Sequence, residues 1–258
     1  MLRTKATVKS LYPLALAEGE GVGTAYEYLA KRLVLSRWLR RRIKNRPVKR
    51  ILLPGIPEKY GVSLNILDEA SRLGASMTVL EDRPAFLTKA RKALKEAQAI
   101  GEIVDYRPAF QQVVDLTDLP ADYQADLVVS SEVIQRFEPE KQRAYLAQIV
   151  QRAPLTVLYI PNGDNEGHTT HSGLNGLTLA ELQILLADLG LEATTGYIDM
   201  PPFPPGIVRS EDQREQAQSG LLEAVAMWGL GWVVRAENLI PRFIRRKQSH
   251  IVYAFIER

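Results

Sequence analysis

The chain has 258 residues, of which 46% are hydrophobic, and a formal net charge of +3 at pH 7. This length fits one sizeable α/β core, and the absence of cysteine excludes disulfides, thiolate metal sites and cysteine nucleophiles. So small a net charge does not by itself indicate a nucleic-acid partner, and no segment approaches the roughly 20 apolar residues of a membrane-spanning helix. We therefore expect a soluble, cytoplasmic protein.

The first expected element is a helix over residues 24–44. Apolar residues recur there at spacings near three and four, and Asn45-Arg46-Pro47 ends the pattern. Basic residues gather in residues 37–50 and again in residues 242–247. Each run is either a solvated helix face or a surface that attracts an anionic substrate, RNA or a membrane.

From residue 48 onward, the sequence predicts alternating strands and helices. Strands are expected at 48–55, 75–82, 125–137, 154–162, 191–200 and 250–257, with a third strand suggested at 102–108. Helices are expected at 63–74, 84–101, 138–153 and 177–190, and residues 210–240 read as mostly helical with a weak point at Gly229 and Gly231. This alternation predicts an α/β, Rossmann-like, doubly wound and mostly parallel seven-stranded sheet with helices on both faces. Such sheets bind ligands beyond the carboxyl ends of their strands.

A glycine turn follows the first strand, in the sequence ILLPGIPEKYGVS of residues 51–63. The order of elements and the residues at the strand ends resemble the class I S-adenosylmethionine-dependent methyltransferases over residues 49–196. In that family the turn lies beneath the methionine part of the cofactor, and Gly55 and Gly61 match two of its glycines. Leu53 stands in place of the usual acid and Pro57 in place of the middle glycine. The resemblance also implies that residues 250–257 form an antiparallel last strand.

The resemblance implies further cofactor contacts at the next strand ends. Glu81 would accept hydrogen bonds from the ribose hydroxyls, a task that suits a carboxylate, although it could also be an ordinary acid at a helix start. Asp115 and the backbone amide of Leu116 would contact the adenine ring, although Asp115 could equally be a turn or cap residue. Ser130 and Ser131 would lie beside the methyl-transfer site.

An N-terminal cap and the loop after the fifth strand complete the expected site. Tyr26 either reaches the cofactor or packs the cap on the core. His168 and His171 are candidates for a base or substrate-orienting group, with loop structure and a metal site as alternatives, although no recognised metal signature is formed. Asn162 and Phe203 are candidate substrate-binding residues.

The predicted function is methyl transfer from S-adenosylmethionine to a small or medium-sized nucleophile. The alternatives are a methyltransferase-like binding or scaffold protein that has lost its ligand, and an RNA-modifying enzyme that uses residues 37–50. We expect an N-terminal helical cap at 1–46, a cofactor-binding core at 47–200, and a segment at 201–258 that completes the same domain. S-adenosylmethionine is the expected cofactor and a small molecule the expected partner; no metal or oligomeric state is predicted.

Overall fold

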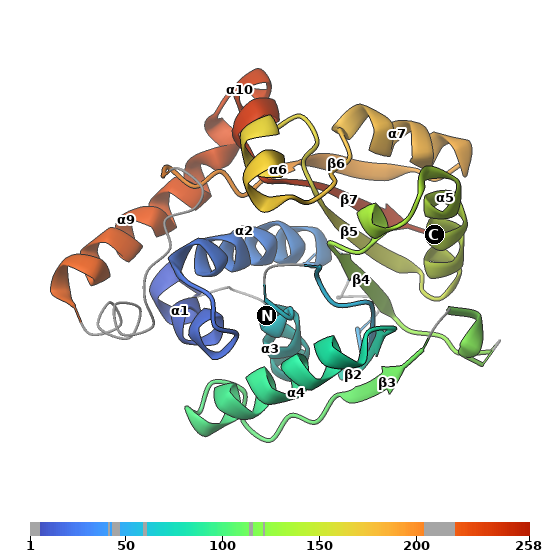
Figure 1. Cartoon of the computed structure of the whole chain (residues 1–258), viewed down its shortest axis with the longest axis horizontal. Helices are drawn as coiled ribbons and strands as arrows, with labels where there is room; N and C mark the ends of the chain where they lie inside the picture. Colours follow the sequence, from blue (N-terminus) through green and yellow to red (C-terminus); the bar gives the residue numbers. More distant parts are fainter. Residues whose placement is uncertain are drawn as a thin grey trace.

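The computed structural model describes residues 6–40, 42, 47–58, 61–113, 116–120, 122–203 and 220–258, without the side chains of residues 221 and 222. A seven-stranded sheet forms the centre of the molecule, in the order β3-β2-β1-β4-β5-β7-β6 (Figure 1). Its strands are β1 (Arg50–Pro54), β2 (Ser76–Glu81), β3 (Ala109–Gln112), β4 (Leu127–Ser131), β5 (Leu155–Pro161), β6 (Ala193–Ile198) and β7 (Ile251–Glu257).

The direction of each strand agrees with the predicted doubly wound class. Neighbouring strands from β3 to β5 are parallel, and β7 is antiparallel to both β5 and β6. The antiparallel last strand is therefore confirmed. The strand order reverses between β1 and β4, which is where sheets of this kind bind their ligands.

Helices cover both faces of the sheet, because successive side chains of each buried strand point to opposite sides. Ile51, Leu53 and Val129 join a core with the helices of one face, whereas Leu52 and Val128 join the core of the other face. The first face carries α1 (Val8–Ala17), α2 (Val22–Leu39), α3 (Leu64–Leu73), α4 (Pro84–Ala99) and α9 (Leu221–Ala236). The second carries α5 (Pro139–Gln151) and α7 (Leu179–Asp188). Short helices α6 (Glu166–Ser172), α10 (Arg242–Gln248), η1 (Leu116–Asp118), η2 (Ile134–Arg136) and η3 (Glu237–Leu239) lie in the connections.

Three elements differ from the sequence prediction. The third strand is β3 at Ala109–Gln112, not residues 102–108, and it escaped notice because an exposed edge strand needs no apolar run. Residues 8–17 form helix α1, whose own bounds were not predicted; it tolerates Pro13 and begins with a capping box between Thr7 and Ser10. The expected weak point at Gly229 and Gly231 does not interrupt α9.

Helix α2 is held on α3 by a buried ion pair. The guanidinium of Arg32, 2% exposed, lies 2.5 Å from Asp68 Oδ2 and 3.3 Å from Glu69 Oε1. Removing one partner of such a pair leaves an uncompensated buried charge, at a cost of about 3–5 kcal/mol. The N-terminal helices are thus firmly attached to the core that they cover.

Part of the basic run at 37–50 lies at the amino-end edge of the sheet. Arg42 Nε is 2.7 Å from the carboxylate of Glu257, whose backbone pairs with the first residue of β5. The backbone amides of Lys49 and Arg50 both donate to Asp126, just before β4. None of the helices in the described part of the chain combines the length and apolar character needed to cross a bilayer.

Candidate functional site

The turn after β1 makes close contacts with this chain's own side chains. Gly55 has a φ of +137°, and a Cβ at this position would lie 2.8 Å from both methyl carbons of Val133. Pro57, which stands where the family has its middle glycine, is buried. Gly55 therefore permits a close approach, and the group that approaches it in this structure is the Val133 side chain that follows β4.

A carboxylate from the connection between α1 and α2 occupies the start of α3. The backbone amides of Val62 and Leu64 donate to Glu18 over 2.8 and 2.6 Å, and the amide of Gly61 donates to Glu20 over 3.2 Å. Gly61 has a φ of +66°, and a Cβ there would overlap Glu18 Oε2. Burial raises the pKa of Glu18 to about 7, against the opposing effect of hydrogen bonds from Tyr28 and the two amides. The free amides that open a helix attract anions, and here the chain supplies its own.

Glu81 lies at the carboxyl end of β2, as predicted for the ribose-binding acid, and its carboxylate is fully buried. Its oxygens accept from the amide of Ile56 over 2.7 Å and from Arg83 Nε over 2.6 Å. A second nitrogen of Arg83, Nη2, donates to the other Glu81 oxygen over 3.0 Å and to the carbonyl of Ile56 over 2.8 Å. Both carboxylate oxygens are therefore satisfied within the chain.

Residues at the end of β4 form hydrogen bonds with helix α2. The ammonium of Lys31 donates to Ser131 Oγ and to Glu132 Oε1, each over 2.9 Å, and it also pairs with Glu27. Burial alone would lower the pKa of Lys31, but Glu27 and Glu132 raise it above its ordinary value, so this ammonium is charged. Ser130 points to the opposite face, where its hydroxyl is 2.8 Å from that of Tyr145. Of these two serines, Ser131 therefore lies on the face of the sheet that α2 covers, and Ser130 lies on the opposite face.

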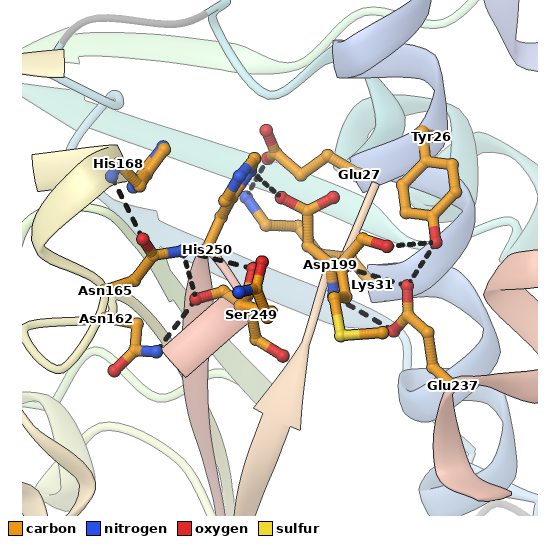
Figure 2. A network of polar contacts seen from close by, with 12 residues as sticks. Tyr26, Glu27, Lys31, Asn162, Asn165, His168, Asp199, Glu237, Ser249 and His250 are labelled. Carbon is orange, nitrogen blue, oxygen red and sulfur yellow. Dashed lines mark hydrogen bonds and ion pairs between the residues drawn. The ribbon is translucent and has the colours of Figure 1, made fainter. Parts of the chain in front are cut away.

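Two stacked histidines, His168 and His250, lie with Asp199 beyond the ends of β5 and β6, and we call them the histidine pair. His250 Nδ1 is 3.1 Å from Asp199 Oδ2, and the ring of His168 stacks on His250 with centroids 4.1 Å apart (Figure 2). The other oxygen of Asp199, Oδ1, is buried and has no hydrogen-bond partner in the described part of the chain. A carboxylate that binds one imidazole nitrogen orients the ring and leaves the other nitrogen to take up a proton.

Two further carboxylates extend this cluster toward α2. Glu237 accepts from the hydroxyl of Tyr26 over 2.6 Å and from the amides of Asp199 and Met200 over 3.1 and 2.9 Å (Figure 2). Burial raises the pKa of Glu237 to about 7. Burial also raises the pKa of Glu27 to about 8, although Lys31 opposes this. Glu27 pairs with Lys31, which reaches the end of β4, and Asp199 lies near enough to raise the pKa of Glu27 further.

The remaining predicted residues take different places. Asn162 is fully buried, and its side-chain amide donates to the carbonyls of Arg246 and Ser249 over 2.8 Å each, so it ties the end of β5 to the segment before β7. Phe203 packs edge to face on Tyr26, with centroids 6.4 Å apart. His171 is exposed on α6. Leu116 is buried at the start of η1, and Asp115 lies outside the described residues.

Several residues of this site did not stand out in the sequence. Glu18 and Glu20 lie in a Glu-Gly-Glu-Gly run, which is compatible with any exposed turn. Lys31 has helical spacing from Glu27 and reads as a surface pair. His250 carried a usable signal, because an antiparallel strand begins at the edge where its parallel neighbours end. The residue just before β7 had therefore to lie at the ligand-binding edge.

The hydrogen-bonding groups at the turn are of the kinds that bind an adenosyl cofactor, but in this structure they bind other groups of the same chain. The amides of Val62 and Leu64 already hold a carboxylate, which is what the methionine part of S-adenosylmethionine would offer. Glu81 already holds several donors, which is what a ribose diol would offer. The groups therefore fit the cofactor chemically, provided that Glu18 and Arg83 move away.

Comparison with solved structures identifies the fold. The magnesium protoporphyrin IX methyltransferase ChlM of Synechocystis PCC 6803, with bound SAH, is 14% identical over 92% of this chain and 84% of its own, with a TM-score of 0.52. The methyltransferase domain of bacterial CtHen1 is 13% identical over 89% of this chain and all of its own (100%), with a TM-score of 0.51. The [4+2]-cyclase SpnF is 15% identical over 88% of this chain and 80% of its own, with a TM-score of 0.52. No protein-family model matches the sequence, and no curated protein matches it significantly.

The chain therefore has the fold of the class I S-adenosylmethionine-dependent methyltransferases, as its sequence predicted. Identities this low establish the fold alone. A structure described as a cyclase matches as well as two described as methyltransferases, so the activity has to be argued from the site.

Proposed function

We propose that this protein is an S-adenosylmethionine-dependent methyltransferase for a small or medium-sized nucleophile, and that Glu18, from the connection between α1 and α2, competes with the cofactor for the amides that open α3. One observation carries the proposal. Two amides at the start of α3, after the turn that follows β1, hold a carboxylate, and Glu81, a buried carboxylate at the end of β2, holds several donors. Both halves of this arrangement complement parts of the cofactor.

The cofactor would be held by groups that the chain now satisfies internally. Val62 and Leu64 would donate to its carboxylate once Glu18 leaves, and Glu81 would accept from its ribose once Arg83 turns away. The adenine contact of Asp115 stays a prediction. When bound, the cofactor supplies a methyl group that is already activated on a sulfonium, so the protein's task is to position the acceptor and handle its proton.

The proton is assigned to the histidine pair. With Nδ1–H of His250 directed to Asp199, Nε2 is the nitrogen that accepts a proton from a hydroxyl or amine of the acceptor. His168 stacks on this ring and limits its movement. Of the two histidines that the sequence suggested, His168 is part of this arrangement, and His171 is exposed on α6.

Calorimetric titration with S-adenosylmethionine and with its demethylated product tests the proposal. We expect wild-type protein to bind weakly, Glu18→Ala to bind about tenfold more tightly or better, and Glu81→Ala to lose at least as much affinity. The gain for Glu18→Ala follows because two buried amides are left without a partner until the ligand arrives, and each such hydrogen bond to a charged group is worth about 1.5–3 kcal/mol. Glu58→Ala is the matched control, because Glu58 is an exposed acid in the same turn.

A second candidate function, a binding or scaffold protein without cofactor, is favoured by the internal partners of Glu81 and of the turn amides. In that case neither wild type nor Glu18→Ala binds either compound while both remain folded by circular dichroism. The RNA-modifying alternative is less favoured, because Arg42, Lys49 and Arg50 lie at the amino-end edge of the sheet, away from the strand ends that carry the site.

A further inference from the structure

Helix α9 presents a row of large apolar side chains to solvent. The spacing of Val225, Trp228 and Trp232 places them on one stripe of α9. Leu239 follows in η3 and Phe243 in α10, which continue the chain beyond α9 (Figure 1). Their exposed fractions are 59% for Val225, 65% for Trp228, 61% for Trp232, 85% for Leu239 and 73% for Phe243. We call these five residues the α9 face. Single exposed apolar residues are ordinary, but a contiguous row with two tryptophans marks an interaction surface.

The opposite side of α9 explains why the helix holds this orientation. Met227 and Val234 are buried in the core that contains the side chains of α1 and α2. Arg235 donates from Nη2 to the carbonyl of Ala6, just before α1. The helix is therefore fixed on the N-terminal helices, and the exposed row is a stable feature of the surface.

In the part of α9 and α10 that the structure describes, the charged side chains are mainly positive. Arg235 lies on α9, and the exposed Arg242 and Lys247 and the half-buried Arg245 lie on α10. Arg246 is neutralised by Asp164, at 2.7 Å. Between residues 220 and 248 the acids are Glu223 and Glu237, and Glu237 is buried against Tyr26. The surface thus combines exposed tryptophans with exposed cations.

We propose that the α9 face docks on an anionic lipid bilayer surface. Tryptophan rings place their apolar body among lipid tails and their N–H group among headgroups, and each basic residue near an anionic surface contributes about 1 kcal/mol. A second copy of the chain is a poorer occupant, because a two-fold contact through this face would bring two sets of like charges together.

Helix α10 connects the α9 face to the histidine pair. Helix α10 leads directly into His250, and Asn162 and Asn165 hold the carbonyls of Arg246, Gln248 and Ser249. Docking through α9 and α10 therefore brings the histidine pair close to the bilayer surface. An acceptor that partitions into the membrane would reach the site from there.

Vesicle binding tests the proposal without any cofactor. Full-length protein is titrated with vesicles of phosphatidylcholine alone and with vesicles containing 30 mol% phosphatidylglycerol, and binding is followed by sedimentation and tryptophan fluorescence. The chain has three tryptophans, and the third, Trp38, is buried and stacked on Phe255. A blue shift therefore reports on Trp228 and Trp232. We expect binding to the anionic vesicles that weakens as salt is added.

Two double variants decide the role of the α9 face. Trp228→Ala with Trp232→Ala should weaken vesicle binding at least tenfold, and Arg242→Gln with Lys247→Gln by about thirtyfold, at about 1 kcal/mol per charge. The control pairs are Ile100→Ala with Ile184→Ala and Lys89→Gln with Lys92→Gln, which are exposed elsewhere and should change nothing.

Three results would overturn the proposal. The first is no binding to anionic vesicles, and the second is binding that both α9-face variants retain. The third is a dimer in analytical ultracentrifugation that the tryptophan variant abolishes, since the face would then belong to a contact between copies. Failure of the methyltransferase assignment would leave this experiment unaffected, because no step in it uses cofactor.

Discussion

Replacing Glu18 with glutamine should change how stability depends on pH, in a direction opposite to that of an ordinary salt-bridged acid. Burial raises the pKa of Glu18 from 4.5 to about 7 in the folded chain. The folded state therefore binds a proton more tightly than the unfolded state. Stability from this group is complete below pH 4.5 and is lost as pH rises through 7.

The size of the effect follows from the shift. A difference of one pKa unit corresponds to 1.36 kcal/mol, so the full shift is worth about 3 kcal/mol, and roughly 2 kcal/mol of it falls between pH 5 and pH 8. Glutamine resembles the protonated acid in shape and does not titrate. The wild type should accordingly lose about 2 kcal/mol relative to Glu18→Gln over that range.

Urea unfolding of both proteins at half-unit intervals of pH measures the difference directly. Glu27 and Glu237, whose pKa values are also raised by burial, titrate in both proteins and cancel in the comparison. If the wild type instead gains stability over Glu18→Gln as pH rises, then the amides of Val62 and Leu64 outweigh burial and the reasoning is wrong.

Three further substitutions test the roles that the structure gives to Gly61, Arg32 and Asn162. Gly61→Ala and Gly74→Ala share the strain of a positive φ, +66° and +65°, but only Gly61 faces Glu18; we expect Gly61→Ala to lose about 2–3 kcal/mol more in urea unfolding. Arg32→Ala should cost about 3–5 kcal/mol, whereas Arg72→Ala, at the exposed partner of the same Asp68, should cost under about 1 kcal/mol in the same assay. Asn162→Ala should cost about 1–3 kcal/mol and speed hydrogen exchange in α10, because the carbonyl of Arg246 loses its donor and that of Ser249 keeps only the longer bond from Asn165; unchanged exchange would mean that Asn162 does not hold α10 in place.

The buried parallel strands were predictable, although not their order in the sheet, because such strands carry continuous apolar runs. The stretches around Leu52, Val128 and Leu158 are of this kind, and each lies in the core. β3 was misplaced because it is a short edge strand whose side chains are mostly exposed. Helix α1 lies within the expected N-terminal helical cap, but its own bounds were not predicted; its sixth residue, Pro13, has no amide hydrogen and removes one hydrogen bond from the helix interior.

The position of a site residue could be predicted from the sequence only where that residue stands at the end of a strand. Glu81 and Gly55 follow strands directly, and the structure places both at the expected edge. The groups that satisfy the turn come from 40 or more positions away in the chain, as the hydrogen bonds from Val62 and Leu64 to Glu18 show. Such long-range pairs leave no local pattern, because an exposed acid in a glycine-rich turn and a buried one have the same neighbours in sequence.

The proton on Glu18 also makes the competition between this carboxylate and the cofactor depend on pH. Displacing Glu18 into water returns its pKa to the ordinary value near 4.5, so displacement releases a proton at any pH between 4.5 and about 7. Displacement is therefore favoured as pH rises, and the affinity for S-adenosylmethionine should increase by about tenfold for each pH unit in this range before levelling off. Calorimetry near pH 6 in two buffers of different ionisation enthalpy should detect close to one proton released per ligand bound, and none with Glu18→Ala. Affinity that is flat with pH in the wild type would mean that the ligand enters without moving Glu18, and that the carboxylate is a permanent part of the turn.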